Sequence, residues 1–442
     1  KEFMMPEEVD ILIRKGLIVT QDPEHHIYHD CDLAIKGEHI LAIGKELPYT
    51  AKKVIDGQRK LVMPGLVDPH MHETITRGIC EDLPLDRWLE EICFPLDKQQ
   101  SWEVMYAAGL MNQLEMIRGG ITTFIDIYQY PDACAQVALK SGLRGIYVPQ
   151  IILDPPGAGE TIESAEEFVK KWKGVSPLIM PGFGPHAPYS NTLEDYQKVG
   201  ELAENCDEPI HTHLSETQWE VGIIRERYGC TATEMLLKAG VLSPRLSVAH
   251  GVYLTDSDVD LLVAHGVGLA YNPTSNMKLA SGIARIPDYQ ARGLVVGVGT
   301  DSNLSNNNLD MFEEMRLGAM LQKMGRNDPS AMPVRLMLDM ATIHAAKVLG
   351  LDKEVGSLEV GKQADVILLD LNHPHLWPMV SGKRSNIEEQ IVYSANAGDV
   401  SHTIVAGKVL MEDGVVQTLD TNEAYEIVNS TNEKFLKRAG LL

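Results

Sequence analysis

The segment Leu61-Val-Met-Pro-Gly-Leu-Val-Asp-Pro-His-Met-His72 joins an apolar, β-branched run to two histidines that stand two residues apart. Amphipathic stretches such as Trp102–Met116 separate this run from later ones, and their apolar residues recur every three or four positions. Eight strands that are apolar on both faces and alternate with helices predict an α/β fold, a (β/α)8 TIM-like barrel. An open doubly wound sheet is the alternative, but it usually needs fewer strands. The seven later runs are Ile121–Ile127, Gly145–Ile152, Leu178–Gly184, Pro209–His213, Leu246–His250, Val267–Tyr271 and Leu294–Thr300.

Both ends of the chain follow a different pattern. Residues 9–56 and 364–416 alternate apolar and polar side chains between turn residues, which is typical of antiparallel hairpins. We therefore predict a small β-sandwich domain built from both termini. The expected division is a β-sandwich part at residues 1–62, a barrel at 63–363, and a second β-sandwich part with a terminal helix at 364–442.

The charge and composition exclude several classes of protein. With 39 Lys and Arg against 62 Asp and Glu, the formal net charge is −23, which argues against a nucleic-acid partner. The longest apolar runs fall far short of the roughly 20 residues that cross a bilayer, so no membrane partner is expected. No signal peptide is recognisable at the start, and the six cysteines include no CxxC pair. These features predict a cytoplasmic protein.

The positions of the histidines carry the functional information. His70 and His72 close the first predicted barrel strand, and residues two apart on a strand point to the same side. A single such pair is more often a core or surface feature than a metal site. Here, however, the pattern repeats at the ends of other strands, where a barrel carries its chemistry. The other residues at such ends are His186, His211, His213, His250 and Asp301. Neutral imidazoles with a carboxylate suit Zn²⁺ or Fe²⁺.

Several segments resemble the signature motifs of the amidohydrolase superfamily. More narrowly, the chain resembles the methylthioadenosine/S-adenosylhomocysteine deaminase group, which also contains the triazine hydrolases. The superfamily motifs are Pro64–His72, His213–Glu216, Ala249–Val252 and Gly299–Ser302. The narrower ones are Glu81–Leu89, Gly182–Tyr189, Asn272–Leu279, Ser305–Asn307 and Val355–Asp365. The resemblance extends over nearly the whole chain.

The resemblance assigns the residues of a metal centre. It implies one divalent metal per chain, with zinc preferred over iron. No lysine lies among residues 177–189, where a lysine could bridge a second metal. It also implies Glu216 as the proton shuttle, with His250 and Asp301 as the other catalytic groups. The spacing alone leaves His211 open as a ligand, whereas the resemblance makes it a neighbour of the ligands. The implied metal ligands are His70, His72, His213 and Asp301.

The implied reaction is the metal-dependent hydrolytic deamination of an aminated heterocycle, with release of ammonia. The resemblance suggests Trp88, Asp97, His186 and Ser305 as residues that bind the substrate. Relatives that bind the homocysteine carboxylate place arginines after the third strand, and residues 147–160 contain none. We therefore doubt S-adenosylhomocysteine as the substrate. Methylthioadenosine, adenosine and a free purine, pterin or pyrimidine remain open. The resemblance also implies a homo-oligomer.

Two alternatives keep the same barrel. A triazine chlorohydrolase or aminohydrolase would use the same residues and differ only in its leaving group. A non-catalytic scaffold would be expected to lose a ligand or Glu216, and all of these residues are present.

Other features have simpler interpretations. Trp88 lies on an amphipathic stretch, where aromatic residues usually pack the core. Ser305 could be an ordinary turn residue, because serine is common in turns. The histidines at positions 25, 26, 29, 373 and 375 are interpreted as surface residues.

Overall fold

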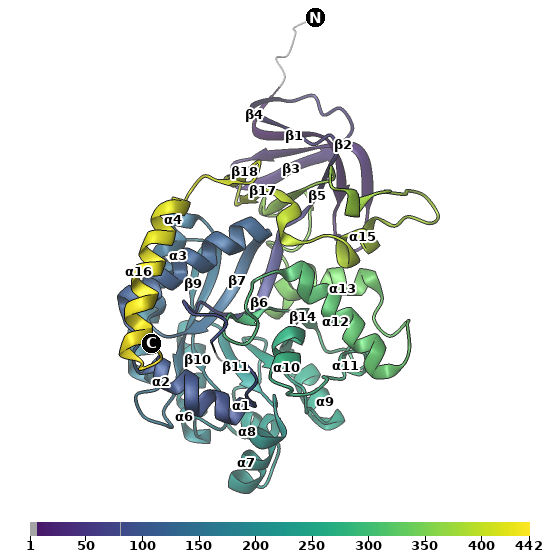
Figure 1. Ribbon diagram of the computed structural model, residues 1–442. Coiled ribbons are helices and arrows are strands. Elements are labelled where there is room, and N and C mark those ends of the chain that lie inside the picture. Colours follow the sequence, from purple (N-terminus) through teal and green to yellow (C-terminus); the bar gives the residue numbers. More distant parts are fainter. Residues whose placement is uncertain (1–6, 80) are drawn as a thin grey trace, which may run out of the picture.

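The computed structural model describes residues 7–79 and 81–442 (Figure 1). A large body of parallel strands surrounded by helices carries a smaller sheet at one end, and the helix at the C-terminus runs along the side of the large body. Cys80 lies outside the described residues. The five cysteines inside them form no disulfide, and no described helix is long and apolar enough to cross a membrane.

Parallel strands form two sheets in the large body. The first has the order β10-β8-β7-β6-β15, with β9 paired to β8, and the second has the order β11-β12-β13-β14. Every pairing within them is parallel, and nearly all of their residues are buried. The strands of the first sheet are β6 (Leu66–His72), β7 (Ile121–Tyr128), β8 (Arg144–Ile151), β9 (Ile179–Pro181), β10 (Gly184–Pro185) and β15 (Asp301–Ser302). Those of the second are β11 (Ile210–Leu214), β12 (Leu246–His250), β13 (Gly268–Tyr271) and β14 (Val296–Val298).

The two sheets meet at both of their edges. An isolated parallel bridge pairs Phe183 with Ile210, and β14 in the second sheet continues after two residues into β15 in the first. This arrangement is a TIM-barrel-like α/β fold. Among the described residues the strand pairing gives two sheets and not one continuous ring, so complete closure of the barrel stays a prediction.

Helices connect the strands and cover their outer side (Figure 1). Serine, threonine or aspartate side chains cap the N-termini of many of them, which satisfies backbone donors that the helix leaves free. The longer connecting helices are α3 (Trp102–Gly119), α4 (Pro131–Ser141), α5 (Ile162–Trp172), α6 (Leu193–Cys206), α7 (Gln218–Tyr228) and α12 (Met311–Arg326). Shorter ones are α1 (Leu85–Trp88), α2 (Phe94–Asp97), α8 (Ala232–Lys238), α9 (Asp256–Ala264), α10 (Pro273–Lys278), α11 (Ile286–Ala291), α13 (Val334–Met340) and α14 (Ile343–Val348). A π-helical turn, η1 (Leu89–Cys93), joins α1 to α2.

Strands from both ends of the chain share the smaller sheet. Its order is β19-β18-β17-β16-β5-β1-β2-β3, with β4 also paired to β1, and the antiparallel pair β5 and β16 joins the two ends. The strands are β1 (Glu8–Val19), β2 (Ile27–Lys36), β3 (His39–Gly44), β4 (Thr50–Asp56), β5 (Lys60–Pro64), β16 (Val366–Asp370), β17 (Val400–Val405), β18 (Lys408–Glu412) and β19 (Val415–Val416). The C-terminal part of the chain also contains the helices α15 (Ile387–Tyr393) and α16 (Thr421–Arg438), which pack against helices of the large body, and the short turns η2 (Pro374–Leu376) and η3 (Ala397–Asp399). The two packed layers of a sandwich, and the boundaries at 62/63 and 363/364, stay predictions.

Candidate metal and catalytic site

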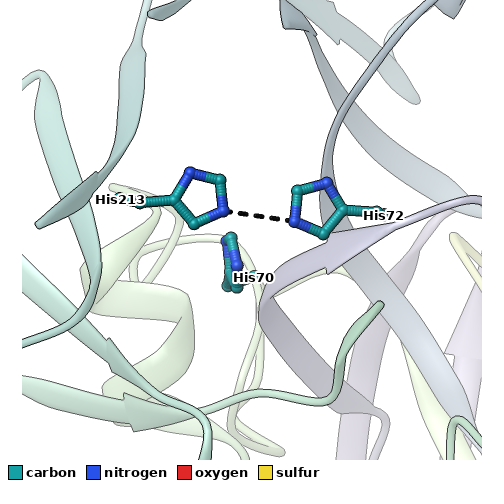
Figure 2. Close-up of side chains that lie close together, drawn as sticks. All are labelled: His70, His72 and His213. Atoms are coloured by element: carbon teal, nitrogen blue, oxygen red, sulfur yellow. Dashed lines mark hydrogen bonds between the residues drawn. The ribbon is translucent and has the colours of Figure 1, made fainter. Parts of the chain in front are cut away.

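Three imidazoles from two strands face one another at the carboxyl ends of the strands (Figure 2). His70 and His72 come from β6 and His213 from β11, and their ring nitrogens lie within 4.8 Å of one another. The Nε2 atoms of His72 and His213 are 3.2 Å apart. Asp301 in β15 adds a carboxylate, whose Oδ1 lies 3.4 Å from Nε2 of His70 and 3.3 Å from Nε2 of His72. The four residues predicted as metal ligands therefore lie together.

Backbone carbonyls orient two of these imidazoles. Nδ1 of His72 donates to the carbonyl of Ile127 at 2.5 Å, and Nδ1 of His213 donates to the carbonyl of His186 at 2.6 Å. A proton on Nδ1 leaves the lone pair of a neutral ring on Nε2, which here points toward the other imidazoles. Both rings are thus held in the tautomer that a metal ligand needs.

His211 lies behind His70. Nε2 of His211 is 2.8 Å from Nδ1 of His70, and Nδ1 of His211 is 2.7 Å from the hydroxyl of Ser247. Both ring nitrogens of His211 are therefore engaged, which leaves none for the cluster. Nε2 of His70, in contrast, is buried and has no hydrogen-bond partner. A buried lone pair of this kind fits a bound cation, because a buried polar atom without a partner is otherwise costly.

Burial favours the neutral form of two of the imidazoles. It lowers the pKa of His70 to about 4 and the pKa of His213 well below its usual value. Burial also raises the pKa of the Asp301 carboxyl, but its contacts with His70 and His72 outweigh this effect and hold the pKa well below the usual range. The cluster therefore combines imidazole nitrogens with one ionised carboxylate, which is a set of ligands suited to a divalent metal.

Glu216 and His250 lie beside Asp301. Nε2 of His250 is 3.8 Å from Oε2 of Glu216 and 3.8 Å from Oδ2 of Asp301, and its Nδ1 is 2.9 Å from Oδ1 of Asn276. Burial raises the pKa of Glu216. Burial lowers the pKa of His250, but the charges of Glu216 and Asp301 outweigh it and raise this pKa. Glu216 and His250 thus stand side by side, and the pKa of each is raised above its usual value.

The backbone at two of these residues is strained. His250 has a φ of 73° and Asp301 a φ of 61°, which lie in the left-handed region that non-glycine residues avoid. His250 is the last residue of β12, and Asp301 is the first residue of β15, three positions after the end of β14. Such strain persists only where the surrounding structure enforces it, and it is concentrated at functional sites. Here it turns both side chains toward the same cluster.

A cavity opens onto the cluster and contains all four residues predicted to bind the substrate: Trp88, Asp97, His186 and Ser305. Nε1 of Trp88 is buried and has no hydrogen-bond partner. Nδ1 of His186 is 3.0 Å from the hydroxyl of Ser190, and burial lowers the pKa of His186 to about 3. The backbone N–H of Ser305 donates to the carbonyl of Ser302, as in a turn, and Ser305 also lines the cavity, while its contact with the substrate stays a prediction.

The sequence did not reveal Tyr128, which ends β7 and also lines the cavity. Its hydroxyl donates to Oδ1 of Asp97 at 2.6 Å, and burial raises the pKa of Asp97 to about 7. Tyr128 stands at the carboxyl end of a strand, like the histidines, so the same rule would have found it. The rest of the cavity wall is largely apolar and comes from Leu85, Leu89, Cys93, Phe94, Leu279 and Leu304.

Comparisons with known proteins agree with this geometry. The model of the amidohydrolase family matches residues 61–410. A 5'-deoxyadenosine deaminase from Methanosarcina mazei is 38% identical over 434 residues, which cover 97% of this chain and 99% of the relative. A 5-methylthioadenosine/S-adenosylhomocysteine deaminase from Moorella thermoacetica is 38% identical over 426 residues, or 96% of each chain. The crystal structure of an adenosine deaminase from Xanthomonas campestris with bound zinc superposes with a TM-score of 0.92 at 30% identity, and covers 98% of this chain and 100% of the other.

Proposed function

The chain belongs to the amidohydrolase family, and on this basis we propose that it removes the amino group from an adenosine-type nucleoside with an apolar 5' substituent. It is a metal-dependent hydrolytic deaminase that releases ammonia from an aminated heterocycle. The observation that carries the proposal is the cluster of three imidazoles and the Asp301 carboxylate, with the buried acid Glu216 nearby.

The metal ligands in this proposal are His70, His72, His213 and Asp301, and the metal is a single zinc ion. The unpartnered Nε2 of His70 and the fixed tautomers of His72 and His213 support this assignment. When bound, a divalent metal lowers the pKa of a coordinated water toward about 7, which supplies a nucleophile at neutral pH. Iron is the alternative, and elemental analysis of the purified protein distinguishes the two metals.

The proton transfers belong to residues of the chain. Glu216 donates its proton to the ring nitrogen beside the carbon that carries the amino group, which reduces the aromatic stabilisation at that carbon. Asp301 accepts a proton from the attacking water. His250, whose pKa is raised, donates a hydrogen bond to the oxygen that adds to the ring. Asp301 then passes the proton that it accepted to the amino group, so that ammonia leaves as a neutral molecule, and the proton of the added hydroxyl group returns to Glu216 as the carbonyl forms.

Two features of the cavity support a nucleoside without a charged tail. Asp97, held by Tyr128, offers a carboxyl group that suits the ribose hydroxyls. Leu85, Leu89 and Phe94 present an apolar surface, and within the described part of the chain no lysine or arginine lines this cavity. The carboxylate of S-adenosylhomocysteine would therefore lose its hydration without gaining a cationic partner. We propose 5'-deoxyadenosine and methylthioadenosine as the preferred substrates.

A substrate panel tests this function. The protein with its metal is incubated with 5'-deoxyadenosine, methylthioadenosine, adenosine, S-adenosylhomocysteine, guanine, a pterin, cytosine and a chlorotriazine, and both ammonia and chloride are measured. We expect the highest kcat/KM for the first two, and a value at least about tenfold lower for S-adenosylhomocysteine. Chloride release from the triazine without deamination would favour the triazine hydrolase instead. No turnover by a protein with bound metal would favour the scaffold.

A further inference from the structure

Glu220 is a buried carboxylate that lies directly against the turn carrying Glu216. Its Oε1 accepts the backbone N–H of Ser215 at 2.9 Å, and its Oε2 accepts the backbone N–H of Glu216 at 2.8 Å. Glu220 belongs to the first turn of α7, which Thr217 caps, and its side chain is fully buried. One carboxylate thus satisfies two consecutive backbone donors with its two oxygens. A neutral amide has only one acceptor oxygen and cannot do so.

The conformation of the turn explains why a carboxylate is placed there. Ser215 has a φ of 52°, in the left-handed region that costs free energy for a residue with a Cβ. A left-handed residue within a turn brings successive N–H groups to one side, where they form a concave site for an anion. The Glu220 carboxylate is the anion at this site. Its loss would therefore release the turn and redirect the Glu216 side chain.

A second residue holds the Glu216 carboxylate itself. The hydroxyl of Ser281 donates to Oε1 of Glu216 at 3.2 Å, while the carbonyl of Ser281 accepts a hydrogen bond from the Tyr253 hydroxyl at 2.6 Å. The backbone N–H of Tyr253 donates in turn to the carbonyl of Ser215 at 2.9 Å. These hydrogen bonds connect the Glu216 turn to the segment after α10. Because Oε1 is engaged, Oε2 is the oxygen left facing His250.

We propose that Glu220 and Ser281 are positioning residues for Glu216. Glu220 fixes the backbone of the turn, and Ser281 engages Oε1, so that Oε2 alone exchanges the proton with the substrate. Neither residue is among those that line the cavity, so they act through Glu216 and do not touch the substrate. The inference rests on the proposed role of Glu216. Since a displacement of about 1 Å can cost 10²-fold in rate, loss of either hydrogen bond has a measurable effect.

Single substitutions give the first test. We expect Glu220→Gln and Ser281→Ala to lower kcat about 10–100-fold while KM stays within about twofold and the metal content is unchanged. Ser281→Thr keeps the hydroxyl and is expected to restore kcat to within about threefold of the original chain. Asp258→Asn is the matched control, because Asp258 is also a buried carboxylate that accepts a backbone N–H, from Thr255, and it does not line the cavity. Its kcat should not change.

Double substitutions distinguish positioning from a merely structural role. In a chain that carries Glu216→Gln, we expect Glu220→Gln and Ser281→Ala to have no further effect on kcat, because the carboxylate that they orient is gone. A further loss of kcat by the same factor as in the single variants would overturn the proposal, as would a failure of Ser281→Thr to restore kcat. If Glu216→Gln by itself loses less than about tenfold in kcat, the proposed role of Glu216 fails first, and the positioning role fails with it. Ser281→Ala supplies the same comparison if Glu220→Gln fails to fold.

Discussion

Asp301 and Asp339 are two carboxylates that each lie close to an imidazole, at different places in the protein. Asp301 lies among the barrel strands, with Oδ1 within 3.4 Å of Nε2 of both His70 and His72. Asp339 is in α13, and its Oδ1 is 3.7 Å from Nδ1 of His25, in the loop after β1. The sequence motifs point to the first carboxylate and say nothing of the second.

The two carboxyl groups have opposite pKa shifts. Contacts with imidazoles outweigh burial at Asp301 and hold its pKa well below the usual range. At Asp339, burial and the charge of Glu388 outweigh the attraction of Arg335 and raise the pKa to about 7. Oδ1 of Asp339 and Nδ1 of His25 are both buried without a hydrogen-bond partner. A carboxylate close to a single histidine is therefore not evidence of a metal site, whereas several converging imidazoles stabilise the ionised form of the carboxylate.

The largest effect is expected from Asp301→Asn. The substitution removes the only negative charge among the four proposed ligands, so we expect the bound metal to be lost and kcat/KM to fall by about 10³-fold or more. Elemental analysis and ammonia release measure the two quantities. Asp339→Asn is the matched control and should keep both metal and activity. An Asp301→Asn protein with full metal content and more than about a tenth of the activity would refute the assignment of Asp301.

Glu216→Gln should have the next largest effect. Glu216 is a buried acid like Asp301 and Asp339, and we propose that it transfers a proton without binding the metal. General acid–base groups contribute about 10²–10⁴-fold, so kcat should fall by a factor in this range. The metal content should stay the same, which separates Glu216 from Asp301. Steady-state kinetics together with metal analysis decide the point, and a loss of kcat below about tenfold would exclude Glu216 as the proton shuttle.

The ligand cluster could be predicted because its signals are local. Residues two apart on a strand share a face, and the ends of parallel strands meet at one edge, so the histidines at the strand ends and Asp301 could be grouped without knowing the packing. The resemblance then selected His70, His72, His213 and Asp301 from this group as the ligands. His211 could not be assigned in this way, since it shares a face with His213. Its partner is His70, on a strand of the other sheet, and only the packing of the two sheets brings them together.

Features that depend on contacts between distant segments could not be predicted from the sequence. His25 was interpreted as a surface residue, yet its side chain is only 21% exposed because the loop after β1 packs near α13. Glu220 accepts the N–H of Ser215 because the backbone of Ser215 is left-handed. A serine in the sequence does not indicate that conformation. Whether the terminal strands form two packed layers is equally a matter of packing, and alternation along the chain does not reveal it.

Asp97→Asn tests a buried acid whose partner is a phenol and not an imidazole. If its carboxyl group binds the ribose hydroxyls, the substitution should lower kcat/KM for 5'-deoxyadenosine about tenfold, because a hydrogen bond to a charged group contributes about 1.5–3 kcal/mol and the amide replaces part of it. A nucleoside that lacks the 2' and 3' hydroxyls is the matched substrate, and its kcat/KM should not change. Equal losses of kcat/KM for both nucleosides would show that Asp97 maintains the shape of the cavity and does not bind the ribose hydroxyls.

Asp339→Asn should have the smallest effect, on stability alone. Because the folded-state pKa of about 7 lies above the unfolded value near 3.8, the folded chain retains a proton between these pH values that the unfolded chain has released. Stability from this group is therefore lost as the pH rises through the window. The uncharged amide removes the loss. Since Asp339 is partly solvated, we expect a gain of about 1 kcal/mol at pH 8, or a rise of about 1–2 °C in melting temperature, and a smaller gain at pH 5.5. Equal gains at both pH values would mean that the pKa of Asp339 is not raised and that the contrast with Asp301 has another cause.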